Sequence, residues 1–104
     1  MPKKKFIINL KGWKFVIKEY IECKNFFQKA RGLMFRGKNF KIPLLFVFPK
    51  PGNYTIHSFF CRKFLAIWLL KNKVIEMKIV KPWRLFVVPK EKFDILIEIP
   101  LGKF

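Results

Sequence analysis

Residues that bind metals or act as nucleophiles are scarce in this sequence, which has one histidine and two cysteines among 104 residues. The two cysteines, Cys23 and Cys61, lie far apart and form no CxxC motif. That spacing argues against a structural zinc site, and so few cysteines argue against a disulfide-rich secreted scaffold. We therefore predict that the protein binds no metal and needs no cofactor.

The sequence also lacks a recognisable catalytic centre. His57 and Cys61 would share one face of a strand, but four residues of extended chain separate them by about 13 Å. The imidazole could not activate the thiol directly over that distance. Ser58 is adjacent to His57 but falls on the opposite face of the same strand. No glycine-rich phosphate-binding loop is present, and we predict that the protein is not an enzyme.

The sequence also has few acidic residues. Its six aspartates and glutamates are outnumbered by 23 lysines and arginines, which gives a net charge of +17. Glu98 would have to meet Asp94 or Glu76 in a cleft to form a pair of catalytic carboxylates, and we interpret each of the three as an ion-pair partner instead. The charge predicts a partner that is nucleic acid or another polyanion, such as anionic lipid or an acidic protein. The alternative is that an AT-rich coding sequence enriches lysine without any selected partner.

No segment of the sequence is apolar for long enough to cross a membrane. The longest apolar run is Phe64–Leu70, whereas a membrane-spanning helix needs about 20 residues. The basic residues 1–5 precede an apolar run too short for a signal peptide, and we expect them to be a flexible N-terminus. The length fits a single domain, which we predict to be a cytoplasmic monomer.

Apolar residues alternate with polar ones along much of the chain, and this period is typical of strands. The clearest case is residues 93–99, in which Asp94 and Glu98 are predicted to point outward. Asn25 and Gln28 form a capping-box pattern at the start of a short helix that Gly32 would end. Loops are predicted at residues 35–42, 49–53 and 71–73. The other strands are predicted at residues 6–10, 13–18, 44–48, 55–61, 64–70, 74–80 and 83–88.

This order of elements predicts a mainly β (α+β) domain. It would contain about seven to eight short strands and one short helix, with turn signals between successive strands. We expect the strands to form a small curled antiparallel sheet or a barrel, because such sheets accommodate many short strands.

The segment 30–36, Ala-Arg-Gly-Leu-Met-Phe-Arg, resembles the Gly-Leu-Met-x-Arg signature of domain-of-unknown-function family 192, also called uncharacterised protein family 0127. Residues 44–48, 57–61, 64–67, 81–83 and 97–102 resemble further motifs of this family in the same order. The resemblance covers residues 14–102 and implies a compact β-rich fold with one helix, but no established activity. Ala66 stands where the family has Asp, and Cys61 where it has Met.

Five residues are candidates for binding an anion or another ligand: Arg31, Arg36, Arg62, Lys81 and Trp83. Arg31 and Arg36 flank the expected end of the helix, where two guanidinium groups could grip phosphate or carboxylate. The alternative is structural, with Arg36 capping carbonyl groups or pairing with a carboxylate such as Glu98.

The basic residues also predict a positively charged face. It would combine a tryptophan available for stacking on bases, Trp83 or Trp13, with a set of basic side chains: Lys14, Lys18, Arg62, Lys63, Lys78, Lys81 and Arg84. Two functions therefore stay open. The first is a small binding or structural module whose ligand is unknown, and the second is nucleic-acid binding through this basic face.

Overall fold

The computed structural model describes residues 6–10, 13–17, 19–23, 42–56, 58, 63–84 and 87–101. Strands dominate these residues, which confirms the mainly β class. Among them no helix has the length and apolar character that crossing a membrane requires. The predicted helix at residues 25–32 lies outside the described residues, as do His57 and Cys61. The strands are β1 (Phe6–Leu10), β2 (Trp13–Ile17), β3 (Ile21–Cys23), β4 (Leu44–Gly52), β5 (Phe64–Leu70), β6 (Lys73–Val80) and β7 (Phe93–Pro100).

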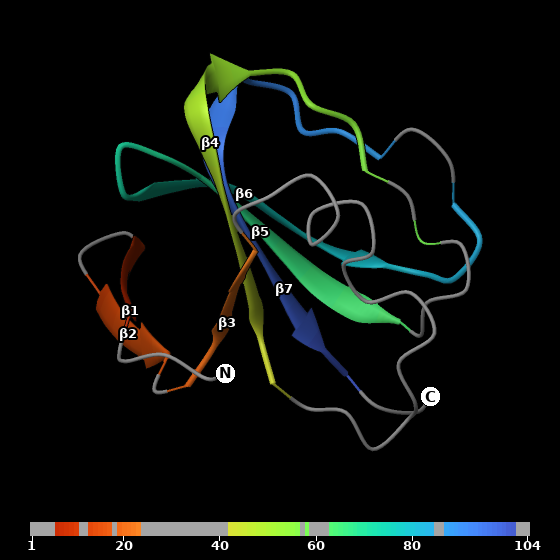
Figure 1. Ribbon diagram of the computed structural model, residues 1–104, viewed down its shortest axis with the longest axis horizontal. Helices are drawn as coiled ribbons and strands as arrows, with labels where there is room; N and C mark the ends of the chain where they lie inside the picture. The colour runs from red at the N-terminus through yellow and green to blue at the C-terminus, as the bar shows by residue number, and fades with distance from the viewer. Residues whose placement is uncertain are drawn as a thin grey trace.

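All these strands belong to one sheet, in the order β2-β1-β6-β5-β7-β4-β3 (Figure 1). The pairs β1–β2, β6–β5, β5–β7 and β7–β4 are antiparallel, whereas β1–β6 and β3–β4 are parallel. The sheet is therefore mixed: four of its six strand pairs are antiparallel, as the sequence predicts, and the two parallel pairs were not predicted. Parallel neighbours cannot be joined by a two-residue hairpin. In agreement with this, β3 ends at Cys23 and β4 begins at Leu44, and β1 and β6 are not consecutive in the chain.

The sheet is open, so the predicted barrel is wrong. A barrel needs its first and last strands to be hydrogen-bonded to each other, and no pairing between β2 and β3 occurs in the described part of the chain. The physical reason lies at the β1–β6 junction. β1 pairs with β6 at one position, Asn9 with Lys73. The β1–β2 hairpin therefore does not run alongside β6 and cannot extend the curvature of the sheet toward a closed barrel.

Two hairpins match the sequence prediction. β1 and β2 pair in register from Phe6–Ile17 to Leu10–Trp13. β5 and β6 are joined by Lys71 and Asn72, whose φ angles are 51° and 68°. Two successive positive φ angles are typical of the type I′ turn, whose twist matches that of the flanking strands.

β4 continues through a segment that the sequence predicts to be a loop. It runs to Gly52 and includes Pro49 and Pro51, so the predicted loop at residues 49–53 is wrong. Prolines are tolerated here for two reasons. β3 pairs only with the first three residues of β4, which leaves the later part without a strand on that side. The register with β7 also shifts between Val47 and Gly52, and a bulge needs fewer N–H donors.

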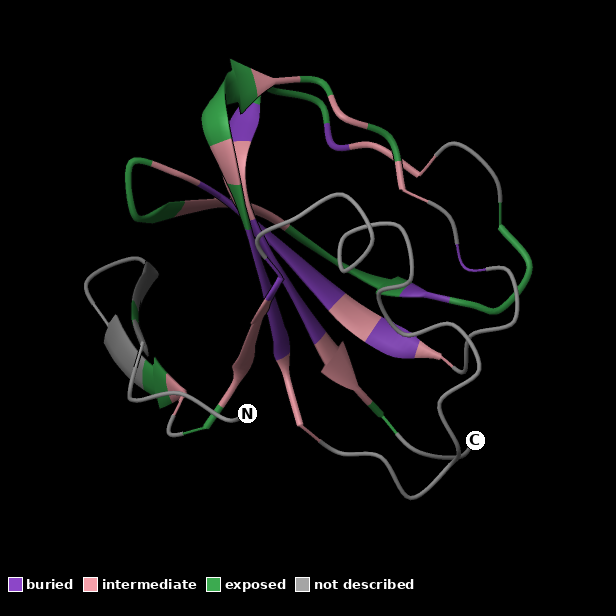
Figure 2. Cartoon of the chain, in the orientation of Figure 1, coloured by how far each residue is buried: buried purple, intermediate pink, exposed green. Residues whose placement is uncertain are grey.

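The core lies on both faces of the central strands, which are purple in Figure 2. We call the face that carries the larger cluster the first face and the other the second face. The buried residues of the first face are Cys23, Leu44, Phe46, Phe64, Ala66, Trp68, Val80, Phe93 and Leu96. Those of the second face are Leu45, Ile67, Leu69 and Ile97. Cys23 forms no disulfide among the described residues.

Burial of both faces overturns one detail of the sequence prediction for residues 93–99. Glu98 was expected to point into solvent, but it is only 5% exposed. Leu96 on the first face and Ile97 on the second face of β7 are also buried, so both faces of this strand, which lies between β5 and β4 (Figure 1), are covered near Glu98. Asp94, nearer the start of β7, is half-buried rather than exposed.

Candidate functional site

Two of the five candidate binding residues, Lys81 and Trp83, lie in one turn directly after β6. The turn comprises Lys81, Pro82, Trp83 and Arg84, and all four residues are exposed. We call it the basic turn. Arg31, Arg36 and Arg62 lie outside the described residues. The structure therefore brings Lys81, Trp83 and Arg84 together, all of them residues that the sequence predicts for a basic face.

Hydrogen bonds of Ser58 attach the basic turn to the interior of the protein. Its hydroxyl Oγ donates a hydrogen bond to the carbonyl oxygen of Lys81 at 2.5 Å and accepts one from the backbone N–H of Arg84 at 2.7 Å. Its backbone N–H donates to the carbonyl of Arg84, and its carbonyl accepts from the N–H of Trp83, both at 3.0 Å. Ser58 is fully buried, and the two bonds of its hydroxyl are partly buried, which reduces competition by water.

A short ladder next to Ser58 strengthens this attachment. Ile56 and Val87 form an antiparallel bridge, with reciprocal backbone hydrogen bonds of 2.9 and 2.8 Å. Ile56 also packs against the first-face cluster. The core therefore holds the segment that carries Ser58, and this segment holds the basic turn.

Trp83 has an uncommon backbone conformation for a large side chain. Its φ angle is 63°, in the left-handed region, which costs an L-residue about 1–2 kcal/mol. Its side chain is 60% exposed, so burial of the indole does little to offset that cost. The hydrogen bonds to Ser58 offset it instead. Such strain is typically retained where a surrounding network enforces it and a function uses it.

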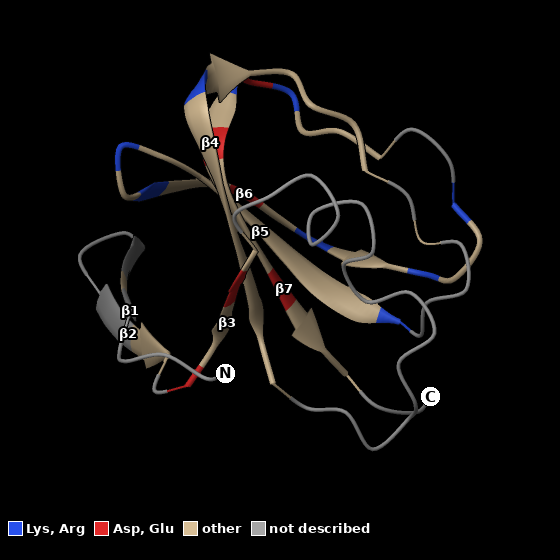
Figure 3. Ribbon diagram, in the orientation of Figure 1, with Lys and Arg blue, Asp and Glu red and all other residues tan. Residues whose placement is uncertain are grey.

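The charges near the basic turn are mostly positive. The first and last residues of the turn, Lys81 and Arg84, are basic, and Figure 3 shows blue segments in the stretch of chain that follows β6. Lys78, three residues before the turn, is 50% exposed and lies 3.9 Å from Glu76, between Nζ and Oε2. An exposed pair at that distance stabilises the fold little and leaves most of the positive field in place.

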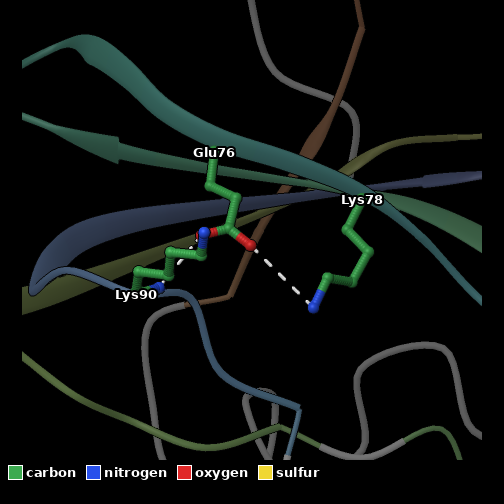
Figure 4. A network of polar contacts seen from close by, with 3 residues as sticks. All are labelled: Glu76, Lys78 and Lys90. Carbon is green, nitrogen blue, oxygen red and sulfur yellow. Dashed lines mark hydrogen bonds and ion pairs between the residues drawn. The ribbon is translucent and has the colours of Figure 1, made fainter.

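Glu76 has a second contact that explains its position. Its Oε1 accepts a hydrogen bond from the backbone N–H of Lys90 at 2.9 Å (Figure 4). The carboxylate therefore links β6 to the segment that leads into β7. This is the ion-pair role expected for acidic residues in so basic a chain, and it is a structural one.

Glu98 is the buried ionisable group of the described residues, and it forms no pair with another carboxylate. Burial raises its pKa from 4.5 to about 8. Asp94 lies four residues along the same strand, about 13 Å away. Glu76 pairs in register with Trp68, whereas Glu98 pairs with Ala66. Within the described ranges, no group of three or more metal-ligating side chains is present either.

Two further buried polar atoms have no hydrogen-bond partner among the described residues: Trp68 Nε1 and Asp94 Oδ1. Trp68 is fully buried in the first-face cluster, and its ring meets that of Phe93 edge-on with centroids 6.4 Å apart. Packing of the two rings explains why Trp68 is retained at this position.

Sequence reasoning missed Ser58 as the anchor of the basic turn. A serine in an otherwise aromatic segment, Phe59 and Phe60 following it, was the available signal, because a buried hydroxyl requires a partner. The burial of Glu98 was also missed. Leu96, which breaks the alternation between Ile95 and Ile97, was the signal that both faces of that strand are covered.

Two solved structures are similar to this chain. A protein of unknown function from Novosphingobium aromaticivorans DSM 12444 has a TM-score of 0.77 and 16% identity, over 97% of this chain and 74% of its own. A candidate transcription regulator from Sinorhizobium meliloti 1021 has a TM-score of 0.75 and 15% identity, over 92% and 78%. The sequence matches no family model and no curated protein. At these identities the likeness concerns the fold alone.

Proposed function

We propose that this protein is a small module that binds single-stranded nucleic acid through the basic turn. The observation that carries the proposal is the position of Trp83, which is 60% exposed, has a φ of 63° and lies between the exposed Lys81 and Arg84. The hydrogen bonds to Ser58 fix the backbone from which the exposed indole projects. Rigidity lowers the entropy lost when a ligand stacks on it.

The chemistry of the turn favours unpaired nucleotides. A base stacks on an aromatic side chain with about 1–3 kcal/mol of binding free energy, and the stacking requires that the base be free of its duplex partner. Lys81 and Arg84, on either side of Trp83, can contact the phosphates that flank such a base. Each phosphate neutralised releases counterions, which gives the binding its salt dependence.

Net charge supports the same proposal. The value of +17 raises the local concentration of any polyanion near the surface and speeds its association. One structural neighbour is described as a candidate transcription regulator, and its fold likeness is compatible with a nucleic-acid partner for this chain.

The proposal is tested by titrating the protein with a fluorescent oligothymidylate at low salt. Trp83→Ala should weaken binding by about 5- to 150-fold, which corresponds to the 1–3 kcal/mol of one stacked base. Trp83→Phe is the matched control, because it keeps an aromatic face and should retain most of the affinity. Lys81→Gln should lower the slope of log affinity against log salt by about 0.7.

Two results would refute this function. The first is an affinity of Trp83→Ala equal to that of the unaltered protein, which would remove the tryptophan from the interface. The second is equal affinity for the oligonucleotide and for a duplex of the same length, which would show attraction by charge without stacking.

We also propose that the chain belongs to domain-of-unknown-function family 192. Support comes from the order of the matching motifs along residues 14–102. The motifs at residues 44–48 and 64–67 fall on β4 and β5, adjacent to β7 on its two sides. A structure of a family member with the strand order β2-β1-β6-β5-β7-β4-β3 would support this membership, and a different order would refute it.

A further inference from the structure

β6 is hydrogen-bonded unequally along its two edges. Its inner edge pairs with β5 along the whole strand. Its outer edge pairs with β1 at the first residue only, where Lys73 lies opposite Asn9. From Glu76 to Val80, the outer edge of β6 is bonded to no other strand of the described residues. We call this stretch the β6 edge.

Side chains along the β6 edge alternate between apolar and charged. Met77 and Ile79 lie opposite Ile67 and Leu65 in the pairing with β5, on the second face. They are 45% and 57% exposed. Lys78 lies between them on the first face and is 50% exposed. Figure 2 shows this exposed stretch of β6 in green, immediately before the buried Val80.

Such an edge is unusual in a soluble protein. An unpaired strand presents free N–H and C=O groups, and proteins normally protect it with charges, prolines or a covering segment. Here one lysine is flanked by two large apolar side chains that are exposed on the second face. The edge therefore offers both main-chain hydrogen bonds and apolar surface to an incoming strand.

We propose that the β6 edge binds an extended acidic segment of a partner protein, which adds to the sheet as a further strand. In this arrangement the main chain supplies the hydrogen bonds and alternate side chains supply specificity. Apolar residues of the partner lie beside Met77 and Ile79 on the second face. An acidic residue between them lies beside Lys78 on the first face, so the partner sequence alternates apolar and acidic residues.

Charge determines the choice of an acidic partner. Lys78 lies on the edge, and Lys81 and Arg84 follow within six residues. The Glu76 carboxylate is already bonded to the backbone of Lys90, so among the described residues its contact with Lys78, at 3.9 Å, is a weak one. A carboxylate directly across from Lys78 would be closer to it and partly shielded from water by the flanking apolar residues.

A second copy of the chain fits this edge poorly. It would bring another net charge of +17 and a second Lys78 to the same site, and like charges opposite each other destabilise a strand pair. The length of the edge sets the length of the partner strand. Five residues span about 16 Å, and Pro82, shortly beyond them, has no N–H to continue the ladder.

The test uses a nine-residue peptide of alternating valine and glutamate, and binding is followed by amide exchange of the full-length protein. We expect alternate amides from Glu76 to Val80 to exchange more slowly with the peptide present, because the new strand bonds every second N–H. A peptide with N-methyl groups at alternate positions keeps its charge but cannot pair. It should leave those amides unprotected, and equal protection by both peptides would overturn the proposal.

Single substitutions test whether the peptide binds at the β6 edge. Met77→Lys and Ile79→Lys should each weaken binding of the peptide by about tenfold or more, although each adds a positive charge. Val16→Lys is the matched control, because Val16 is 48% exposed and belongs to β2, a strand at one end of the sheet. That control should bind at least as well as the unaltered protein. Weaker binding by Val16→Lys with unchanged binding by Ile79→Lys would assign the peptide to β2 and refute the proposal.

The variant Trp83→Ala distinguishes oligonucleotide binding at the basic turn from peptide binding at the β6 edge. That variant should bind the peptide normally, because Trp83 is outside the β6 edge. Sedimentation of the protein alone should show a single monomeric species. A dimer that Ile79→Lys dissociates would show that the edge pairs with its own copy, which contradicts an acidic partner.

Discussion

Ala66 lies directly opposite Glu98 in the antiparallel pair of β5 and β7. Both residues belong to the first face, and both are buried, at 0% and 5% exposure. The row continues to Lys78 on β6, which is the register partner of Ala66. Two strand spacings separate Lys78 from Glu98, about 10 Å, so a methyl group rather than a charge faces the carboxyl group. This arrangement leaves Glu98 with desolvation as the cause of its raised pKa.

Glu98 should make the stability of the protein depend on pH. Its pKa is about 8 when folded and 4.5 when exposed, so the folded state holds a proton that the unfolded state releases between these values. Stability therefore falls as pH rises from about 4.5 to 8 and is constant above that. Glu98→Gln removes the ionisation and should be more stable than the unaltered protein by roughly 3–5 kcal/mol at pH 9.

Urea unfolding at pH 5, 7 and 9 measures this effect. At pH 5 the two proteins should differ by less than about 1 kcal/mol, because both then carry a neutral side chain. Glu91→Gln is the control, since Glu91 is exposed and its substitution should leave the pH profile unchanged. A profile for Glu98→Gln as steep as that of the unaltered protein would contradict the buried position of this carboxyl.

Substitution of the neighbouring Ala66 tests the same row. Ala66→Asp places a second carboxyl opposite Glu98 in a fully buried position, and it should cost about 2–4 kcal/mol of stability at pH 9. Ala66→Asn has a similar size without the charge and should cost less. In the Glu98→Gln background the cost of Ala66→Asp should shrink, because repulsion between two ionised carboxylates is removed. Equal costs in the two backgrounds would show that residues 66 and 98 do not interact.

Ser58→Ala should loosen the basic turn. It removes the hydroxyl that bonds to the carbonyl of Lys81 and to the N–H of Arg84, and the loss should cost about 1–3 kcal/mol. Affinity for the oligonucleotide should fall as well, because Trp83 is no longer held at a φ of 63°. Thermal unfolding and titration measure the two effects, and Thr55→Ala, an exposed hydroxyl nearby, should change neither.

Gly52→Val should destabilise the end of β4. A Cβ atom at residue 52 would lie 2.9 Å from Cε2 of Tyr54. The Tyr54 ring cannot move away freely, because it stacks on Phe48 with centroids 4.2 Å apart and its hydroxyl donates to the carbonyl of Lys50 at 2.7 Å. Overpacking of this kind costs about 1–3 kcal/mol.

A smaller side chain at residue 54 provides the control for the prediction on Gly52→Val. Tyr54→Leu removes the ring that a larger residue at position 52 would meet, so Gly52→Val should cost less stability in a Tyr54→Leu background. Denaturant unfolding of the four proteins gives the coupling between the two sites. Additive costs would show that the ring of Tyr54 does not limit residue 52.

Local sequence patterns predicted much of the sheet but not its topology. The alternation and the turn residues located β5, β6 and β7, and the turn at Lys71 and Asn72 between the first two. The parallel pairing of β1 with β6, at Asn9 and Lys73, has no local signal, because it depends on where the β1–β2 hairpin lies in space. The extension of β4 through Pro49 was unpredictable for a related reason, since it depends on where β3 ends.

The sequence predicted which residues belong to the candidate site, but not which contacts hold them in place. Charge and aromatic character identified Lys81, Trp83 and Arg84 from the sequence. Their common turn is fixed by Ser58, which is 23 to 26 residues away along the chain, and no local pattern reveals a contact of that range. The exposure of Met77 and Ile79 has no local signal either, because it depends on which segments lie beside this end of β6.

The indole signals of the protein test the central claim most directly. The chain has three tryptophans, each with an Nε1–H resonance, and Trp83→Phe identifies the signal of Trp83. On titration with oligothymidylate at low salt, the Trp83 signal should shift in a saturable way while that of the buried Trp68 stays in place. A saturable binding curve during which the Trp83 signal does not move would contradict the account, because the base would then be bound away from the basic turn.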